Sequence, residues 1–365
     1  MALVAMAAAS LTGCHIVSGV APNPAPQGTN VSLAGYGFGA SQGSSTVLLD
    51  GTPLTIVSWS SSQIVVTLPS PKAEGTYSLT VVVAGQSASL PFRIDNAPEG
   101  SITDFQVITA ETAADTTSPK AVQATCPAGT LLLSGGAEFI DPQPGLMLNA
   151  AGPNGAPGLP DSFLAAGYDA TGTATAWALR STALCGNAAG YTGGTGNFPF
   201  GPHGGVGTGF TCPANRFAIG GGLQVGGATT DVVITESTPG ANASTLPNFW
   251  GVSAASRVVS PGAWGFRWDI VCATELPGQE LVEVESASDL STTKSATATC
   301  PGGTRAVGGG AEAHFSTFPS LIGLTRTAPT GPPAAPTGWS ATAEALAPMA
   351  EPWSLETRVV CAAID

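Results

Sequence analysis

Apolar and polar residues alternate along much of the chain with the two-residue period of β-strands. Between residues 16 and 95, six short apolar runs follow one another, separated by Gly, Pro, Asn and Asp. The segment "WGFRWDIVC" alternates over a longer stretch and places five residues on one face of a strand: Trp264, Phe266, Trp268, Ile270 and Cys272. The pattern predicts an all-β protein with many short strands joined by tight turns.

The first segment predicts an immunoglobulin-like sandwich, because six or seven short strands fit into about 80 residues. The stretches "VSGVAPNPAPQGTNVSLAGYGFG" (Val17–Gly39), "WSSSQIVVTLP" and "PFRI" resemble the IPT/TIG domain. This resemblance implies a non-enzymatic module, found in cell-surface receptors and as a spacer beside polysaccharide enzymes. We assign residues 15–97 to it. Trp59 lies in a turn common in that family, so we expect it to pack at an edge of the sandwich.

The rest of the chain contains three copies of one unit. The segments "TCPAGTLLLSGGAEF", "TCPANRFAIGGGLQV" and "TCPGGTRAVGGGAEA" begin at Thr125, Thr211 and Thr299. Each is followed by a Pro, an aromatic residue, a Trp and a closing Cys. The copies resemble a cysteine-bounded repeat of secreted bacterial proteins with no established activity. They divide the chain into three β-repeats: 98–186, 187–275 (with a Gly-rich insert) and 276–365. Three such units could pack around a pseudo-threefold axis.

Six of the seven cysteines belong to these copies. The symmetry between copies favours the disulfides Cys126–Cys185, Cys212–Cys272 and Cys300–Cys361. A second symmetric arrangement stays open: Cys185–Cys212 and Cys272–Cys300, with Cys126–Cys361 closing a ring. Disulfides are typical of secreted proteins. The cysteines do not form C-x-x-C pairs and the three histidines do not recur, so we expect no metal and no cofactor.

The seventh cysteine, Cys14, follows the short apolar run "MALVAMAAASLTGC". The "LTGC" at residues 11–14 resembles the lipobox of bacterial lipoproteins, in which the Cys carries the lipids and becomes the mature N-terminus. The resemblance implies a signal peptide at residues 1–14. It also implies a membrane anchor on Cys14, which would hold the protein at the outer surface of a bacterial cell envelope. No later segment reaches the roughly 18 apolar residues of a membrane span.

The glycine run Gly308–Gly310 invites comparison with a phosphate-binding loop. Such a loop needs a Lys and a Ser or Thr after its glycines, whereas here "AEA" follows. Because the run recurs in a strand-like setting, we expect a β-bulge or a close approach between backbones.

Residues for catalysis are scattered. No G-x-S-x-G or H-E-x-x-H motif occurs. Glu138 and Glu312 follow two of the glycine runs, but Gln224 stands in the middle copy. The spacing of carboxylates along the sequence neither identifies nor excludes a glycosidase-like carboxylate pair, because such a pair is assembled in three dimensions. The recurring pairs Asp115–Lys120 and Asp289–Lys294 are expected to cap turns and form surface charge pairs. We therefore expect no enzymatic activity.

The charge balance excludes nucleic acid as a partner. The chain has 24 Asp and Glu against 11 Lys and Arg, a net charge of −13, and no basic cluster to displace phosphate counterions. These features predict a non-catalytic cell-surface lipoprotein with a structural, adhesive or partner-binding role. Its partner would be a surface polysaccharide or another surface protein.

The alternative is a lectin-like protein that binds carbohydrate through its repeats. Aromatic faces suit sugar rings, and one aromatic residue recurs in each copy between the Pro and the Trp: Phe163, Trp250 and Trp339. The competing interpretation places these rings in the core. A second recurring aromatic, at Trp177, Trp264 and Trp353, shares its strand face with the closing Cys, and we expect it in the core.

Overall fold

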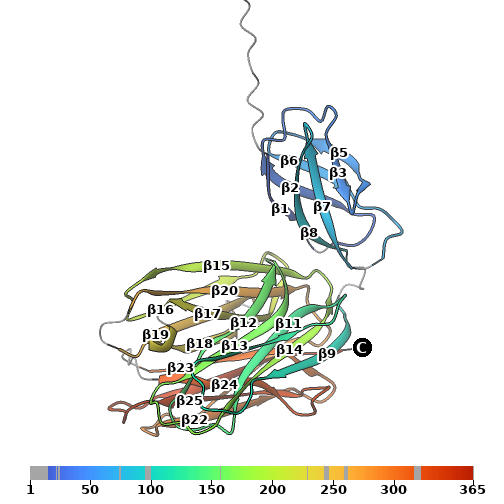
Figure 1. The fold of residues 1–365 in the computed structure, drawn as a ribbon. Coiled ribbons are helices and arrows are strands. Elements are labelled where there is room, and N and C mark those ends of the chain that lie inside the picture. Colours follow the sequence, from blue (N-terminus) through green and yellow to red (C-terminus); the bar gives the residue numbers. More distant parts are fainter. Residues whose placement is uncertain are drawn as a thin grey trace, which may run out of the picture. The chain divides into compact units, whose positions relative to one another are not determined.

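A computed structural model describes residues 15–364, except positions 22, 24, 74, 95–99, 157, 228, 242–245, 259–261 and 316–321. The chain divides into two compact units, residues 1–96 and 97–365 (Figure 1). Within the described residues, regular structure consists of β-strands and one short 3-10 helix, η1 (Thr229–Asp231). None of the described helical structure is long and apolar enough to cross a membrane. The predicted signal peptide and the lipidation site Cys14 lie outside the described residues.

The N-terminal unit consists of two four-stranded antiparallel sheets. The first has the order β1 (Ile16–Ala21), β2 (Asn30–Tyr36), β6 (Gln63–Thr67), β5 (Thr55–Trp59). The second has the order β4 (Thr52–Pro53), β3 (Thr46–Leu49), β7 (Gly75–Val83), β8 (Gln86–Ile94). Alternate residues of β2 and β6, such as Val31, Leu33 and Ile64, are buried between the sheets. The predicted immunoglobulin-like sandwich is confirmed. Trp59 packs edge-on against Phe38 and donates its indole N–H to backbone carbonyls.

The second unit is built from three six-stranded antiparallel sheets. Sheet I has the order β10 (Lys120–Thr125), β13 (Leu159–Asp169), β12 (Leu146–Ala156), β17 (Phe217–Gly227), β20 (Trp264–Ala273), β15 (Thr192–Gly201). Sheet II has the order β16 (Gly205–Thr211), β19 (Phe249–Ser256), β18 (Val232–Gly240), β23 (Arg305–His314), β26 (Ser354–Ala362), β21 (Glu280–Glu285). Sheet III has the order β22 (Thr293–Thr299), β25 (Gly338–Ala345), β24 (Ile322–Thr330), β11 (Leu131–Ile140), β14 (Ala178–Ala188), β9 (Ile102–Glu111).

Each sheet takes half of its strands from one repeat and half from another. The first repeat contributes β10, β12 and β13 to sheet I but β9, β11 and β14 to sheet III, and the other repeats divide in the same way. Repeat 3 pairs with repeat 1 in sheet III, which closes the cycle. The central strands β12, β18 and β24 contact one another, as do β11, β17 and β23. This is the pseudo-threefold arrangement that the sequence suggested.

Each disulfide joins the two halves of one repeat across two sheets. The bridges are Cys126–Cys185, Cys212–Cys272 and Cys300–Cys361, so the pairing within each copy is present and the ring pairing is not. Cys126 follows β10 of sheet I, whereas Cys185 lies on β14 of sheet III. Each bridge closes a loop of 59, 60 or 61 residues. A disulfide that closes a loop of this size stabilises a fold by about 4 kcal/mol, because it lowers the conformational entropy of the unfolded chain.

The three glycines of the run Gly308–Gly310 accommodate three different neighbours. A Cβ atom on Gly308 would overlap the carbonyl oxygen of Ile219, in the preceding repeat. One on Gly309 would meet the ring of Trp339, and one on Gly310 would overlap the carbonyl oxygen of Ser237 on β18. A β-bulge begins each run, as shown by the register shifts before Ser134, Gly220 and Gly308. The expected bulge and the expected close backbone approach are therefore both present.

The recurring lysine is buried rather than exposed. Lys120 donates to the Asp115 carboxylate at 2.7 Å and to the Trp177 carbonyl, and its Nζ lies 4.7 Å from the centre of the Trp177 ring. The hydrogen bond from Lys120 lowers the pKa of Asp115 to about 2. The equivalent Lys294 pairs with Asp289 in the same way. Asp115 caps a turn as expected, but the prediction of a surface charge pair is wrong for the lysines, which pack on the core Trp.

Gly310→Ala tests whether close backbone approach holds the repeats together. The new methyl group would separate β23 from β18, and we expect the unfolding free energy of residues 97–365 to fall by about 3 kcal/mol. Gly302→Ala is the matched control, because a Cβ there has no heavy atom within 4 Å. Denaturant unfolding with the disulfides intact measures both. Equal stability of the two variants would contradict the role assigned to Gly310.

Candidate functional site

One row of residues crosses the centre of each six-stranded sheet at equivalent positions of the repeats. In sheet III the row is Arg326, Glu138, Arg180 and Glu111, directly opposite one another on four strands. In sheet II it is Glu236, Glu312, Glu356 and Glu285. In sheet I it is Ala150, Gln224, Arg267 and Asn197. The fold keeps the positions, whereas the charge at each position differs between sheets.

The row of sheet III alternates in charge and neutralises itself. Arg180 donates to Glu138 at 2.9 Å and to Glu111 at 2.6 Å, and Arg326 donates to the second oxygen of Glu138. The Glu138 side chain is only 11% exposed, while those of Arg180 and Arg326 are 34% and 32% exposed. The carboxylate is thus enclosed by two guanidinium groups that still face solvent. The buried Nε of Arg326 has no hydrogen-bond partner among the described residues.

An open groove lies over this row. Thr182 and Thr109 form the next row of the sheet on the same face, and the proline-rich segment 329–336 forms the facing wall. The pocket over Glu138 has a volume of about 320 Å³. A second pocket of about 360 Å³ continues along β9 and shares Val107, Thr109 and Pro333 with the first. Together they form an elongated groove with guanidinium donors, hydroxyl groups and apolar proline surfaces.

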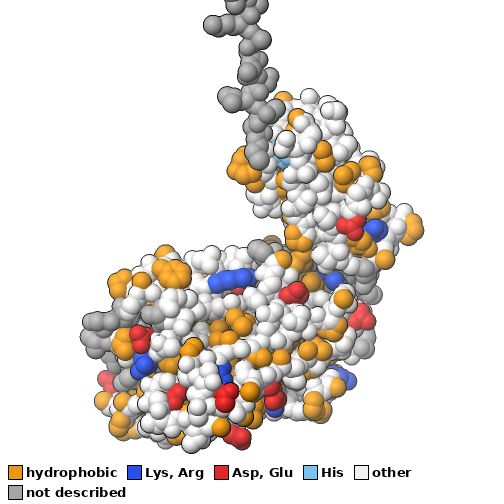
Figure 2. All heavy atoms as spheres, viewed as in Figure 1, with side chains coloured by type: hydrophobic (Ala, Val, Ile, Leu, Met, Phe, Trp, Pro, Cys, Tyr) orange, Lys and Arg blue, Asp and Glu red, His pale blue; other side chains and the backbone are white. Residues whose placement is uncertain are grey.

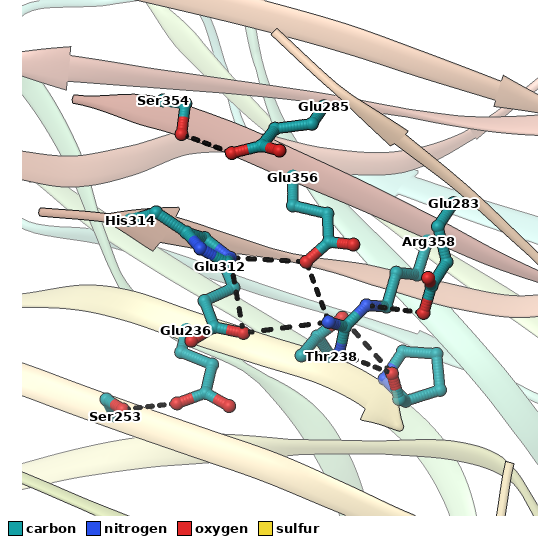
Figure 3. Close-up of polar contacts among 11 residues, drawn as sticks. Glu236, Thr238, Ser253, Glu283, Glu285, Glu312, His314, Ser354, Glu356 and Arg358 are labelled. Carbon is teal, nitrogen blue, oxygen red and sulfur yellow. Dashed lines mark hydrogen bonds and ion pairs between the residues drawn. The ribbon is translucent and has the colours of Figure 1, made fainter. Parts of the chain in front are cut away.

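The row of sheet II places four glutamates opposite one another, which is unfavourable without compensation. Figure 3 shows an arginine and a histidine side chain beside them. Arg358 lies 2.7 Å from Glu356, and the His314 Nε2 atom lies 3.2 Å from Glu356 and 3.6 Å from Glu312. The hydrogen bond with Glu356 raises the pKa of His314, and the same bond lowers the pKa of Glu356. The cluster remains acidic, because its glutamates outnumber Arg358 and His314 together.

Glu236 is the most perturbed carboxyl of this row. Burial raises its pKa to about 7, and the neighbouring Glu312 carboxylate adds to the shift. Ser253 donates a hydrogen bond to it. Beside it, the donor atoms of Glu312, His314 and Glu356 all lie within 4.8 Å of one another. Carboxylate oxygens and an imidazole nitrogen suit several divalent cations, so among the described residues these three could hold a metal.

The aromatic residues expected to bind sugar lie in the core. Phe163, Trp250 and Trp339 are 2%, 1% and 0% exposed, and each ring covers one glycine of a glycine run. Trp250 and Trp339 also donate their indole N–H groups to Ser237 and Thr327. These three residues therefore do not form an exposed sugar platform, and that prediction is corrected. The second recurring aromatic set is buried as expected: Trp177, Trp264 and Trp353.

Most charged members of the rows in sheets II and III were missed in the sequence, among them Arg180, Arg326 and Glu236. A signal existed, because Arg180 follows Trp177 by three residues as Glu356 follows Trp353, and Arg326 precedes Pro329 as Glu236 precedes Pro239. An alignment of the three copies would have placed these equivalent residues in the same columns. The pairing of one column with another depends on the register between strands of different repeats, which the alignment does not contain.

Glu236→Gln tests the buried carboxyl of sheet II. The folded-state pKa of about 7 exceeds the ordinary value of 4.5, so the folded protein binds more protons between these values and loses stability as the pH rises through them. Removing this titration should stabilise the variant relative to wild type by roughly 1–3 kcal/mol more at pH 8 than at pH 5. Unfolding at both pH values measures the difference, with Glu280→Gln on β21 as control. A difference independent of pH would contradict the burial of Glu236.

Comparisons with known proteins identify one domain. A search of curated proteins finds no match. Similar solved structures include SGBP-B from a complex xyloglucan utilization locus in Bacteroides uniformis, 12% identical, covering 47% of this chain and 72% of that chain, with a TM-score of 0.20. SGBP-B of a Bacteroides ovatus mixed-linkage glucan utilization locus is also 12% identical, covering 68% and 70%, with a TM-score of 0.17. A family model does match residues 16–94, which form an IPT/TIG domain.

Proposed function

We propose that this is a non-catalytic binding protein of a bacterial cell surface, lipid-anchored through Cys14. In this proposal the IPT/TIG domain is the spacer and residues 97–365 are the binding head. The observation that carries the proposal is the groove over sheet III. Two adjoining pockets along β9 give it the length to hold an extended chain rather than a compact small molecule.

The groove suits a polymer that presents oxygen atoms as hydrogen-bond acceptors. Arg180 and Arg326 line the groove, and their side chains are about one-third exposed. Guanidinium groups bind carboxylate and hydroxyl oxygens with defined geometry. Thr109 and Thr182 add hydroxyl groups, and the proline wall offers apolar contact. A surface polysaccharide or an extended segment of another surface protein presents such groups.

A binding role fits the groove better than catalysis does. Among its described lining residues, Glu138 is the single carboxylate, and both of its oxygens are held by arginines. Hydrolysis of a glycosidic bond needs a pair of carboxyl groups with separate acid and base roles. On the face shown in Figure 2, Lys and Arg side chains form small separate groups, which fits the expectation that nucleic acid is not the partner.

Thr109→Trp tests the groove. Thr109 is exposed on β9, so the indole should fill the groove without disturbing the core. We expect binding of purified protein to isolated cell-wall polymers and to whole cells to weaken at least about tenfold, because the ligand loses its contact surface. Biolayer interferometry and cell pull-down measure this, and the wild-type interaction should also weaken at high salt.

Thr297→Trp is the matched control for this experiment. Thr297 is exposed on β22, at the opposite edge of the same sheet. If both tryptophan variants bind as wild type does, the groove is not the binding surface. If purified wild-type protein releases products from the polymers, the proposed non-catalytic role is wrong.

A further inference from the structure

The middle repeat departs from its two sister repeats at three neighbouring core positions. Phe210 stands where the sisters have Ala124 and Ala298, one residue before the Thr-Cys pair. Trp268 stands where they have Ser181 and Thr357, four residues before the closing Cys. The rings of Phe210 and Trp268 stack face to face, and both side chains are only half-buried.

The third departure removes a side chain. On β15, Gly194 lies opposite Ile270. The equivalent positions of the sister repeats carry Ile108 opposite Ala183 and Val282 opposite Val359. Those branched side chains pack against the cores of their repeats. A Cβ on Gly194 would meet only the Cγ2 atom of Ile270, at 3.0 Å, so packing leaves open space at this point.

These changes open a cleft between the edges of two sheets. β15 is the edge strand of sheet I, and β16 is the edge strand of sheet II. In the sister repeats the corresponding edges contact each other, β9 with β10 and β21 with β22. In the middle repeat a cleft of about 310 Å³ lies between β15, β16 and β20, and Phe210 and Trp268 form part of its lining.

The cleft combines aromatic surface with neutral hydrogen-bonding groups. None of the described lining residues carries a charge. Thr192 and Thr211 contribute hydroxyl groups, and the two edge strands contribute outward-facing backbone N–H and C=O groups. Aromatic faces match the C–H faces of a pyranose ring, while hydroxyl and backbone groups match its hydroxyls. A charged ligand would lose its hydration here without gaining a counter-charge.

We propose that this cleft is a binding site for a neutral saccharide, seated against the Phe210–Trp268 pair. The site is separate from the groove over sheet III, and it is confined to the middle repeat because the other two repeats lack the three changes. In this proposal carbohydrate is bound by residues other than the buried Phe163, Trp250 and Trp339, which were the candidates for a lectin-like site in the sequence. The aromatic residues of this site are found because they differ from the residues of the other repeats, and not because they recur in every repeat.

Gly194→Val tests the site by placing in the cleft the side chain that repeat 3 has at Val282. The purified oxidised protein is titrated with neutral hexasaccharides of glucose, mannose, xylose and N-acetylglucosamine, followed by tryptophan fluorescence and calorimetry. Wild type should bind at least one of them with a change in tryptophan emission. Gly194→Val should bind it at least tenfold more weakly. Gly204→Val is the control, because a Cβ there has no heavy atom within 4 Å.

A second variant protects the test against misfolding of the first. Phe210→Ala with Trp268→Ser installs residues with which repeat 1 folds, and it should also abolish binding while the disulfides and circular dichroism stay unchanged. Thr109→Trp should leave this binding intact, which separates the cleft from the groove. The proposal is overturned if no neutral saccharide binds wild type, if Gly194→Val binds as wild type does, or if uronate oligosaccharides bind equally well.

Discussion

Contact between bare backbones is the constraint on which the second unit depends. At Gly308 and Gly310, and at Gly220 and Gly222, a neighbouring strand occupies the place of a Cβ atom. This lets the central strands of three sheets come together and pair across repeat boundaries. The interface between repeats is therefore a hydrogen-bonded β-ladder inside each sheet rather than a contact between finished modules. No single repeat can form a complete sheet alone.

This construction leaves the outer faces free to differ. The register between repeats comes from the backbone, so Glu138 faces Arg326 and Glu312 faces Glu236 whatever their charges are. One fold thus presents a neutralised row beneath a groove, an acidic row with a buried carboxyl near neutral pKa, and a nearly uncharged row. The middle repeat adds a cleft by changing residues at a sheet edge, where the ladder is not affected.

The sequence was informative wherever the signal is local or repeated. Strand alternation predicted the all-β fold and the core position of Trp264, and repeat symmetry favoured the observed disulfides. The sequence did not predict the burial of a side chain where this burial depends on which other strand packs over it. Phe163 was a candidate platform because its strand pattern does not reveal that Gly135 of another sheet lies beneath the ring. The pairing of Glu138 with Arg326 joins residues 188 positions apart, across repeats, and no local pattern encodes it.

The disulfides also determine how the molecule responds to a pulling force. A load applied through the two ends of the chain is carried by covalent bonds. At each bridge the disulfide carries the load, and the 59 to 61 residues that it encloses bear none. Those residues cannot be drawn out while the bridges are intact. Between Cys126 and Cys361, extension is limited to the connecting segments between one closing Cys and the next opening Cys. Within residues 126–361, intact bridges therefore limit elongation under load to a fraction of the contour length of that segment.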